Sequence, residues 1–354
     1  MPNTDHPQLT CRHTLCNYIF SILNRVLLNY RGAMQVRCFN YRHLFKWLTI
    51  LLLTFASLST NASGEPPLSD GKKPSNNITP FTPYVMPRSD VRTIKSDQGA
   101  EYRIYIAWPE EPAPPEGYPV LYRLDGTTSF AIAAEYANRL GRYTGMSPGI
   151  IVGIGYAGPS RRRLDYTPDV APGIEFLSNP DPTGGADEFL TFIADSLIPA
   201  IENDFPINSN RRSISGYSLG GLFVTQALLK RPELFRTYIA SSPSLWWGDR
   251  HVFNLIPKFQ NRLSKDGHAR RLFLTIGQYE QSPPPGMEND PSWQKNAELN
   301  ALARMNDNAS ELVEALSSTA GLSVHLEEFP NETHASGSLP AIRASLRHAF
   351  ADEY

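Results

Sequence analysis

A Gly-x-Ser-x-Gly segment at 216–220, placed between a β-prone stretch and a helical one, most narrowly limits the folds open to this chain. In such a nucleophile elbow, a sharp strand-to-helix turn holds the serine in a strained conformation, and the glycines let neighbouring backbone pass closely. Apolar residues recur near a 3.6-residue period from Leu219 to Lys230, which predicts a helix with one buried face. We therefore expect Ser218 to project from a sheet edge; an ordinary glycine-rich helix start is the alternative.

The first 62 residues have the layout of a targeting segment. Three basic residues precede an uncharged apolar run at 47–58, and small residues follow up to Ala62. This order predicts a secretory signal peptide cleaved near Ala62, because twelve apolar residues are too few to span a bilayer comfortably. An uncleaved membrane anchor and a buried core helix are the alternatives. Residues 1–33 precede Met34, where a signal peptide of usual length would begin, and we assign them no structural role.

Charge and cysteine usage exclude several classes of protein. Residues 1–62 hold six Lys or Arg and one Asp, which leaves 27 basic and 34 acidic residues and a net charge of −7 in the remainder. No basic patch there suggests binding to nucleic acid. Every cysteine precedes the predicted cleavage point, so the mature chain has no disulfide framework, cysteine nucleophile or cysteine zinc site. The three cysteines are Cys11, Cys16 and Cys38.

The remainder divides into a predicted flexible linker at 63–83, rich in Pro, Ser, Asn and Gly, and one folded domain at 84–354. In that domain strands alternate with helices, which predicts an α/β fold with a mostly parallel central sheet flanked by helices and opened by an antiparallel hairpin. The expected strands are 91–95, 101–108, 120–124, 149–155, 211–215, 238–242, 271–276 and 322–329. The expected helices are 129–140, 186–205, 219–230, 296–319 and 338–350. Two irregular segments, 156–185 and 281–295, are long enough to suggest functional loops.

The serine hydroxyl needs a base within hydrogen-bond reach, and five histidines lie outside the leader, all after Ser218. Ligands of such sheets lie beyond the carboxyl ends of the strands. His334 falls between the last strand and the last helix, so it is the predicted base. His325 lies inside the last expected strand, His348 inside the last helix, and His268 in a charged loop, which favours structural or solvent-exposed positions for them.

A third side chain is expected to orient the imidazole of the base and to stabilise its charged form. Glu280 follows the strand at 271–276 and preserves the chain order serine, acid, histidine. It is the predicted acid. Asp249 and Asp290 are alternatives, as is a serine–histidine dyad with no tight third member.

The oxyanion of a tetrahedral intermediate requires backbone donors near the serine. The N–H of Leu219, directly after Ser218, is one expected donor. Gly126 and Thr127, which follow the strand at 120–124, are expected to supply the other. A plain Asp-Gly turn is the alternative for this segment.

These residues together resemble the putative-esterase family of the α/β hydrolases, which includes trilactone siderophore esterases for enterobactin-like compounds and is related to esterase D. The resemblance covers roughly residues 84–350. It implies that Ser218 is the nucleophile, His334 the base, and the Gly126 and Leu219 regions the oxyanion donors. The segments that carry it are Leu121-Tyr122-Arg123-Leu124-Asp125-Gly126, Asp165-Tyr166-Thr167-Pro168, Gly216 to Gly221, Ser242-Pro243-Ser244-Leu245-Trp246-Trp247, and His334.

Arg162, in a run of three arginines, and the pair Trp246 and Trp247 offer cationic and aromatic surface that suits an anionic, aromatic ligand such as a ferric catecholate. A solvated or paired arginine run with two core tryptophans is the alternative. We expect an exported serine esterase that needs neither metal nor cofactor and acts on a small-molecule ester, including siderophore esters. A carbohydrate-ester or feruloyl-type esterase, and a non-catalytic binding protein that keeps the fold, stay open.

Overall fold

The computed structural model of the chain describes residues 82–140, 145–171, 173 and 181–351. The predicted signal peptide and nearly all of the predicted linker lie outside these residues. From Pro83 onward the chain forms one compact unit. No helix among the described residues combines the length and the apolar character needed to cross a membrane.

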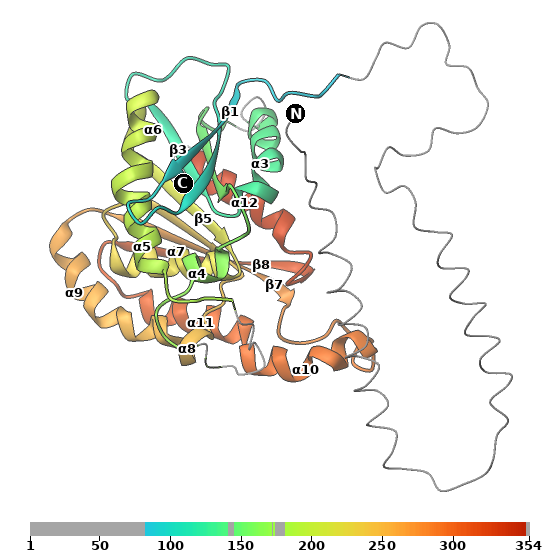
Figure 1. The fold of residues 1–354 in the computed structure, drawn as a ribbon. Helices are drawn as coiled ribbons and strands as arrows, with labels where there is room; N and C mark the ends of the chain where they lie inside the picture. The colour runs from blue at the N-terminus through green and yellow to red at the C-terminus, as the bar shows by residue number, and fades with distance from the viewer. Residues whose placement is uncertain (1–81, 141–144, 172, 174–180, 352–354) are drawn as a thin grey trace, which may run out of the picture. The chain divides into compact units, whose positions relative to one another are not determined.

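The described residues form a sheet of eight strands in the order β1-β2-β4-β3-β5-β6-β7-β8 (Figure 1). β1 pairs antiparallel with β2, and β2 pairs antiparallel with β4, whereas all the other neighbours are parallel. The expected mostly parallel sheet with an opening antiparallel hairpin is confirmed. The strands are β1 (Ser89–Lys95), β2 (Glu101–Ala107), β3 (Tyr118–Arg123), β4 (Ile150–Tyr156), β5 (Ile207–Tyr217), β6 (Thr237–Ser241), β7 (Arg270–Tyr279) and β8 (Leu322–Thr333).

Helices cover both faces of this sheet, as expected for parallel strands joined by crossovers (Figure 1). One face carries α3 and α12, which also contact each other; the other carries α5, α6, α7, α9 and α11. The helices are α3 (Gly126–Leu140), α4 (Arg162–Tyr166), α5 (Ala186–Phe192), α6 (Ile198–Asp204), α7 (Leu219–Lys230), α8 (Trp247–Arg250), α9 (Ile256–Asp266), α10 (Pro291–Ala303), α11 (Met305–Leu316) and α12 (Ser338–Phe350).

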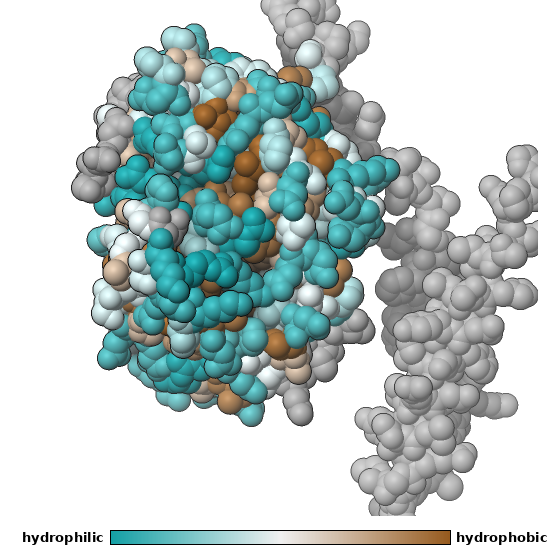
Figure 2. Space-filling model, turned by 90° about the vertical axis from the view of Figure 1, so that its left-hand side faces the viewer, coloured by the Kyte–Doolittle hydropathy of each residue, from teal (hydrophilic) through white to brown (hydrophobic). Residues whose placement is uncertain are grey.

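A separate hydrophobic core lies on each face of the sheet. Alternate residues of β3 divide between them, because successive side chains of a strand point to opposite faces. Tyr122 packs in the larger core with Phe223 of α7, and Leu121 packs in the smaller one with Phe130 and Leu346. The side of the molecule on which α5, α6 and α9 lie is mostly hydrophilic, with apolar side chains scattered among polar ones (Figure 2).

Four helical regions differ from the sequence-based expectation. α7 is buried on nearly all sides from Gly220 to Leu229, not on one face, because α4 and α9 pack on its outer side. The expected helix at 186–205 contains a π-helical turn, Ile193–Leu197, just before Pro199. α9 was not anticipated at all. The fourth region is 296–319, where two helices replace the single helix that was expected.

The expected single helix at 296–319 is wrong, because the chain breaks at Arg304 into α10 and α11. Arg304 has φ 44° and ψ 47°, the left-handed conformation that ends a helix. The buried Asn308 donates from its side-chain amide to the carbonyl of Ala303 at 3.0 Å, so it satisfies a carbonyl that the break leaves without an intrahelical partner. The last five residues of the segment expected to be irregular, 291–295, belong to α10.

Candidate active site

Ser218 lies at the turn between β5 and α7 in a backbone conformation that non-glycine residues rarely adopt, with φ 60° and ψ −118°. Two glycines permit this turn through close backbone approach. A Cβ at Gly216 would lie 2.3 Å from the carbonyl oxygen of Gly220, and one at Gly221 would lie 2.7 Å from that of Ser241. The Ser218 N–H donates to the Ser241 carbonyl at 3.0 Å, which ties the elbow to β6. This is the strained geometry that the Gly-x-Ser-x-Gly pattern predicts.

The structure brings together three of the predicted site residues from three separate loops. His334 Nε2 lies 3.1 Å from Ser218 Oγ, and His334 Nδ1 lies 2.6 Å from Glu280 Oε2. A carboxylate accepts hydrogen bonds, so the hydrogen on the imidazole is on Nδ1 and the lone pair of Nε2 faces the serine hydroxyl. The arrangement is the one required for proton transfer from Oγ to the imidazole.

Glu280 is held rigidly in this arrangement. Its side chain is fully buried, and its second oxygen, Oε1, accepts hydrogen bonds from Ser242 Oγ at 2.6 Å and from the Gly277 N–H at 2.7 Å. A buried carboxylate needs such partners, since its desolvation is otherwise costly. Only one orientation of the carboxylate satisfies all three contacts, so Oε2 stays directed at His334.

Tyr217 fixes the other side of the imidazole. Its hydroxyl donates to the backbone carbonyl of His334 at 2.7 Å, and the two rings lie 5.3 Å apart. Burial, with a further contribution from the charge of Glu280, raises the pKa of Tyr217, so the phenol stays protonated and able to donate. Sequence reasoning missed both Tyr217 and Ser242. Their positions at the carboxyl ends of β5 and β6 were the available signal.

The alternative acids lie elsewhere. Asp290 is the N-cap of α10 and accepts from the backbone N–H of Ser292 at 2.8 Å. Asp249 is exposed, on a turn in which its φ is 50°. The described residues place neither carboxylate in a hydrogen bond with His334.

The other candidate histidines do not reach Ser218. His325 lies in β8 as expected, where Nε2 contacts Ser323 Oγ at 2.9 Å. His348 lies in α12 as expected, stacked on Phe273 with ring centroids 3.7 Å apart. His268 is exposed before β7. Among the described hydrogen bonds of Ser218, the only imidazole partner is His334.

The predicted oxyanion donors all lie in the first turns of helices. Leu219 begins α7, while Gly126 and Thr127 begin α3. N–H groups in the first turn of a helix have no intrahelical acceptor, and no described residue accepts a hydrogen bond from these three N–H groups. The two helix starts lie close together: a Cβ at Gly220 would be 3.5 Å from Asp125 Oδ2. Both helix dipoles favour negative charge at this point.

A cavity of about 550 Å³ lies between α3 and α12, and Thr127 is the one proposed oxyanion donor that lines it. Arg162 lines it, but its guanidinium is already engaged: Nε donates to Asp125 Oδ1 at 3.1 Å and Nη2 to the Tyr217 carbonyl at 3.3 Å. Burial acts to lower the pKa of Arg162, but the charge of Asp125 and its hydrogen bond, with smaller effects from Tyr166 and Tyr156, together outweigh burial, so the net shift is upward. Arg161 pairs with the buried Asp165 at 3.2 Å. Arg161 and Arg162 therefore match the sequence-based alternative in which the arginines are paired with acidic side chains.

The tryptophan pair does not act as one surface. Trp247 is fully buried in the larger core, so the prediction that it offers aromatic surface to a ligand is replaced by the packing alternative. Trp246 is partly buried and packs against the same core. Neither tryptophan lines the 550 Å³ cavity.

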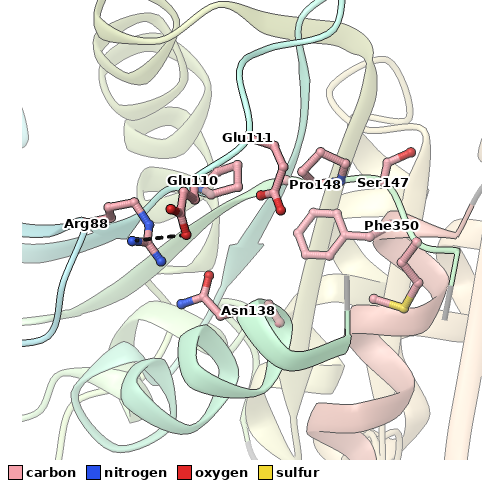
Figure 3. Close-up of a pocket in the computed structure, with 11 residues that line it drawn as sticks. Arg88, Glu110, Glu111, Asn138, Ser147, Pro148 and Phe350 are labelled. Atoms are coloured by element: carbon pink, nitrogen blue, oxygen red, sulfur yellow. Dashed lines mark ion pairs between the residues drawn. The ribbon is translucent and has the colours of Figure 1, made fainter. Parts of the chain in front are cut away.

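A second cavity, of about 100 Å³, lies at the opposite edge of the sheet, near the amino ends of the parallel strands (Figure 3). Arg88 and Glu110 approach each other there at 3.9 Å, and Ser147, Pro148 and Phe350 form the other side. It holds none of the predicted site residues. Within the described chain, no group of three or more His, Cys, Asp or Glu side chains is arranged to hold a metal ion.

The sheet, its flanking helices and the serine elbow at its carboxyl edge define an α/β hydrolase. The chain belongs to the family described as "Putative esterase", whose family model matches residues 96–320. It is 36% identical to the ferri-bacillibactin esterase BesA of Bacillus subtilis over 285 residues, 75% of this chain and 91% of that protein. It is 32% identical to the siderophore triacetylfusarinine C esterase of Aspergillus fumigatus, over 77% of this chain and 96% of that one.

Solved structures give the same result for the fold. The BES protein from Bacillus cereus superimposes with a TM-score of 0.66 at 30% identity, covering 78% of this chain and all of that one. The siderophore hydrolase EstB from Aspergillus nidulans superimposes with a TM-score of 0.67 at 29% identity, covering 77% of this chain and 98% of the other. The expected family and fold class are confirmed, and the similar proteins with named activities are ester hydrolases.

Proposed function

We propose that this protein is a serine esterase that hydrolyses carboxylic esters through an acyl-enzyme intermediate. The observation that carries the proposal is the continuous chain of contacts from Ser218 Oγ through His334 to Glu280, at 3.1 Å and 2.6 Å. A nucleophile, a base and an orienting acid in this order are the parts that acyl transfer requires.

In the first half-reaction, Ser218 Oγ attacks the ester carbonyl carbon while His334 Nε2 takes the hydroxyl proton. The N–H groups of Leu219 and of Gly126 or Thr127 receive the negative charge that forms on the carbonyl oxygen. The imidazolium then gives its proton to the departing alcohol oxygen, and the carbon–oxygen bond of the ester breaks. Glu280 stabilises the imidazolium and holds its orientation throughout.

In the second half-reaction, water replaces the alcohol. His334 takes a proton from the water as its oxygen attacks the acyl carbon, and the same backbone donors receive the charge. Collapse of the tetrahedral intermediate returns the proton to Ser218 Oγ and releases the carboxylic acid. No step uses a group other than the side chains and amides already described.

Siderophore esters are the substrate class that we propose. The support is similarity: the relatives above are named for the esters of ferri-bacillibactin and of triacetylfusarinine C. Trp246, which is partly buried, and the 550 Å³ cavity lined by Thr127 and Tyr217 are the surfaces on which such a substrate would be recognised. Hydrolysis of carbohydrate or feruloyl esters is the competing specificity of the same site.

A substrate panel separates these possibilities. Purified protein is given linear and cyclic catecholate esters, a fungal-type hydroxamate ester, methyl ferulate and an acetylated sugar, with the Ser218→Ala variant as the control. We expect a siderophore ester to have the highest kcat/KM and the variant to hydrolyse none of the panel. A preference for methyl ferulate or the sugar ester would overturn the substrate assignment. Binding without hydrolysis of any ester would make the protein a binding protein.

We also propose that the protein is exported. The proposal rests on the basic, apolar and small-residue segments that end near Ala62. Expression of the full chain, followed by fractionation and N-terminal sequencing, tests it. A mature N-terminus close to residue 63 outside the cytoplasm is the expected result, and an intact leader on protein retained in the cytoplasm is the contradicting one.

A further inference from the structure

A buried arginine that the proposed mechanism does not use lines the cavity between α3 and α12. Arg123 is the last residue of β3, is 6% exposed, and points to the face of the sheet that carries α3 and α12. A buried cation is costly unless a negative charge or several acceptors surround it. The hydrogen-bond partners of Arg123 therefore indicate the role of this residue.

The hydrogen-bond partners of Arg123 are serine hydroxyls. Nε donates to Ser129 Oγ at 2.9 Å, and Nη1 donates to Ser215 Oγ at 3.2 Å and to Ser345 Oγ at 3.1 Å. No carboxylate forms an ion pair with this guanidinium among the described residues, and none of them accepts a hydrogen bond from its Nη2 group. Arg162, by contrast, is paired with Asp125.

Arg123 remains a cation at neutral pH. Burial lowers the pKa of its guanidinium to about 10, against a weaker opposing effect from Asp125, so the group is still protonated at pH 7. The serines hold the guanidinium in place without neutralising it. A held, unneutralised charge at the floor of a cavity attracts an anionic ligand group.

The cavity around Arg123 has the size and lining of a ligand site. Its volume is about 550 Å³, within the range of small-molecule pockets. Most of its exposed wall surface is apolar, and the polar groups besides Arg123 are hydroxyls of α3, of α12 and of Ser160, together with the Arg162–Asp125 pair. The apolar and aromatic lining residues are Leu124, Ile132, Tyr156, Tyr217, Leu339 and Ile342.

Two of the lining residues connect the cavity with the proposed reaction centre. Thr127, one of the proposed oxyanion donors, and Tyr217, which bonds to the His334 carbonyl, both line it. A substrate whose carbonyl carbon lies at Ser218 can therefore extend one of its ends into this space.

We propose that this cavity selects esters that carry a negatively charged group, and that Arg123 is the specificity-determining residue that binds the charge. This inference rests on the proposed esterase activity. It adds the chemical class of substrate: a carboxylate or similar anion joined by an apolar or aromatic segment to the ester. Because the serine hydroxyls carry no negative charge, the guanidinium should favour an anionic substrate over a neutral one of equal size.

Matched ester pairs test the proposal and show which end of the substrate enters. The first pair, mono-p-nitrophenyl glutarate and its methyl ester, differs in charge on the acyl side. The second, 4-acetoxybenzoate and its methyl ester, differs in charge on the leaving group. We expect the wild-type protein to prefer the anionic member of one pair, and Arg123→Met to lower kcat/KM for that ester by about 10- to 100-fold. Its kcat/KM for the neutral member should stay within about threefold.

A second set of variants avoids the buried position. Ile132 lines the cavity and is 47% exposed, so Ile132→Glu places a repelling charge at its mouth without disturbing the core. Ile132→Gln is the neutral control, and Leu302→Glu, at a 52% exposed residue outside the cavity, controls for net charge. Only Ile132→Glu should lower kcat/KM for the anionic ester, by about 3- to 10-fold.

Two results would overturn this proposal: no preference for either anionic ester in the wild-type protein, or a preference that survives both Arg123→Met and Ile132→Glu. Failure of the underlying esterase proposal looks different, because all four esters would then stay uncleaved, or would be cleaved equally by Ser218→Ala.

Discussion

Glu280 and His334 face each other across 2.6 Å, from Oε2 to Nδ1, although they follow different strands, β7 and β8. These strands are parallel neighbours, so their carboxyl ends open on the same edge of the sheet. Glu280 is buried with its other oxygen held by two donors, whereas His334 is 44% exposed in its side chain. The buried partner therefore positions the more exposed one, and this asymmetry motivates the first prediction.

Replacing Glu280 with Gln should lower kcat for p-nitrophenyl butyrate by about 10²- to 10⁴-fold while KM changes little. An amide can present its NH₂ group to Nδ1, which would favour the wrong imidazole tautomer, and it cannot stabilise the imidazolium. Steady-state kinetics with a thermal melt of the variant provides the measurement. Activity close to wild type would show that Ser218 and His334 act without this acid.

Asp290 provides the matched control for that experiment, because it was the competing candidate and is an N-cap instead. Asp290→Asn keeps a good capping residue, and Asp290→Ala removes the acceptor for the Ser292 N–H. We expect unchanged kcat in both variants and a small loss of unfolding free energy in the alanine variant alone.

The elbow should tolerate no side chain at Gly216. A Cβ there would lie 2.3 Å from the Gly220 carbonyl oxygen, so Gly216→Ala must push α7 away from β5. We expect a loss of about 1–3 kcal/mol in unfolding free energy together with nearly complete loss of turnover. Gly158→Ala is the control, since a Cβ at that position would meet nothing within 4 Å. Equal stability of the two variants in urea denaturation would refute the steric explanation of the turn.

Tyr217→Phe should lower kcat by about 2- to 10-fold without changing KM. The variant loses the hydrogen bond to the His334 carbonyl, worth about 0.5–1.5 kcal/mol, but keeps the ring contact. Tyr217 is a positioning residue in this account, so the imidazole should occupy the reactive position less often. Tyr84→Phe, at an 81% exposed residue, is the control. A rise in KM with kcat unchanged would instead point to a role in substrate binding.

His348 should make the fold less stable in acid. Burial, and more weakly the charges of Arg347, Arg271 and His325, lower the pKa of His348 to about 4 from an unfolded value near 6.5, although Glu327 Oε2 lies 3.8 Å from His348 Nε2. Between these values the unfolded chain binds more protons than the folded one, so unfolding free energy falls as pH drops from 6.5 to 4. At about 1.4 kcal/mol per pH unit, the loss reaches about 3 kcal/mol.

The variant His348→Phe isolates this effect from the titration of carboxylates, because an aromatic ring can keep the stack on Phe273. Urea denaturation at several pH values should show that, between pH 6.5 and 4, the unfolding free energy of the variant falls by about 3 kcal/mol less than that of the wild type. His268→Gln, at an exposed histidine, should keep the wild-type slope. Identical slopes in wild type and His348→Phe would contradict the prediction.

Much of this architecture is predictable because local patterns agree with one another. The strand at 149–155, rich in β-branched residues and glycine, and the helix at 338–350 were expected within one residue of their observed bounds. The division at Arg304 was not predicted, because neither glycine nor proline marks it in the sequence at 296–319. The break depends on a side-chain bond from Asn308 that no window average detects. The helix α9 did carry a signal, since Ile256, Phe259 and Leu263 recur at helical spacing, but we did not predict it.

The candidate site was predictable where a residue follows a strand. Ser218, Glu280 and His334 all do, and the position shortly after the strand at 271–276 favoured Glu280, since the competing aspartates preserve the same chain order. Arg123 could not be found this way, because it lies within a strand, where a sequence pattern cannot tell a surface cation from a buried one. Trp247 was assigned wrongly for a related reason: a sequence pattern cannot show that an aromatic residue near a site points into the core.

Covalent labelling tests the central claim most directly. The protein is treated with a fluorophosphonate, digested, and analysed by mass spectrometry, alongside Ser218→Ala and His334→Ala. We predict one adduct per chain, on Ser218, absent from Ser218→Ala and formed at least about 100-fold more slowly in His334→Ala. A wild-type protein that hydrolyses esters but carries no adduct on Ser218, or labels equally fast without His334, would contradict the proposed mechanism.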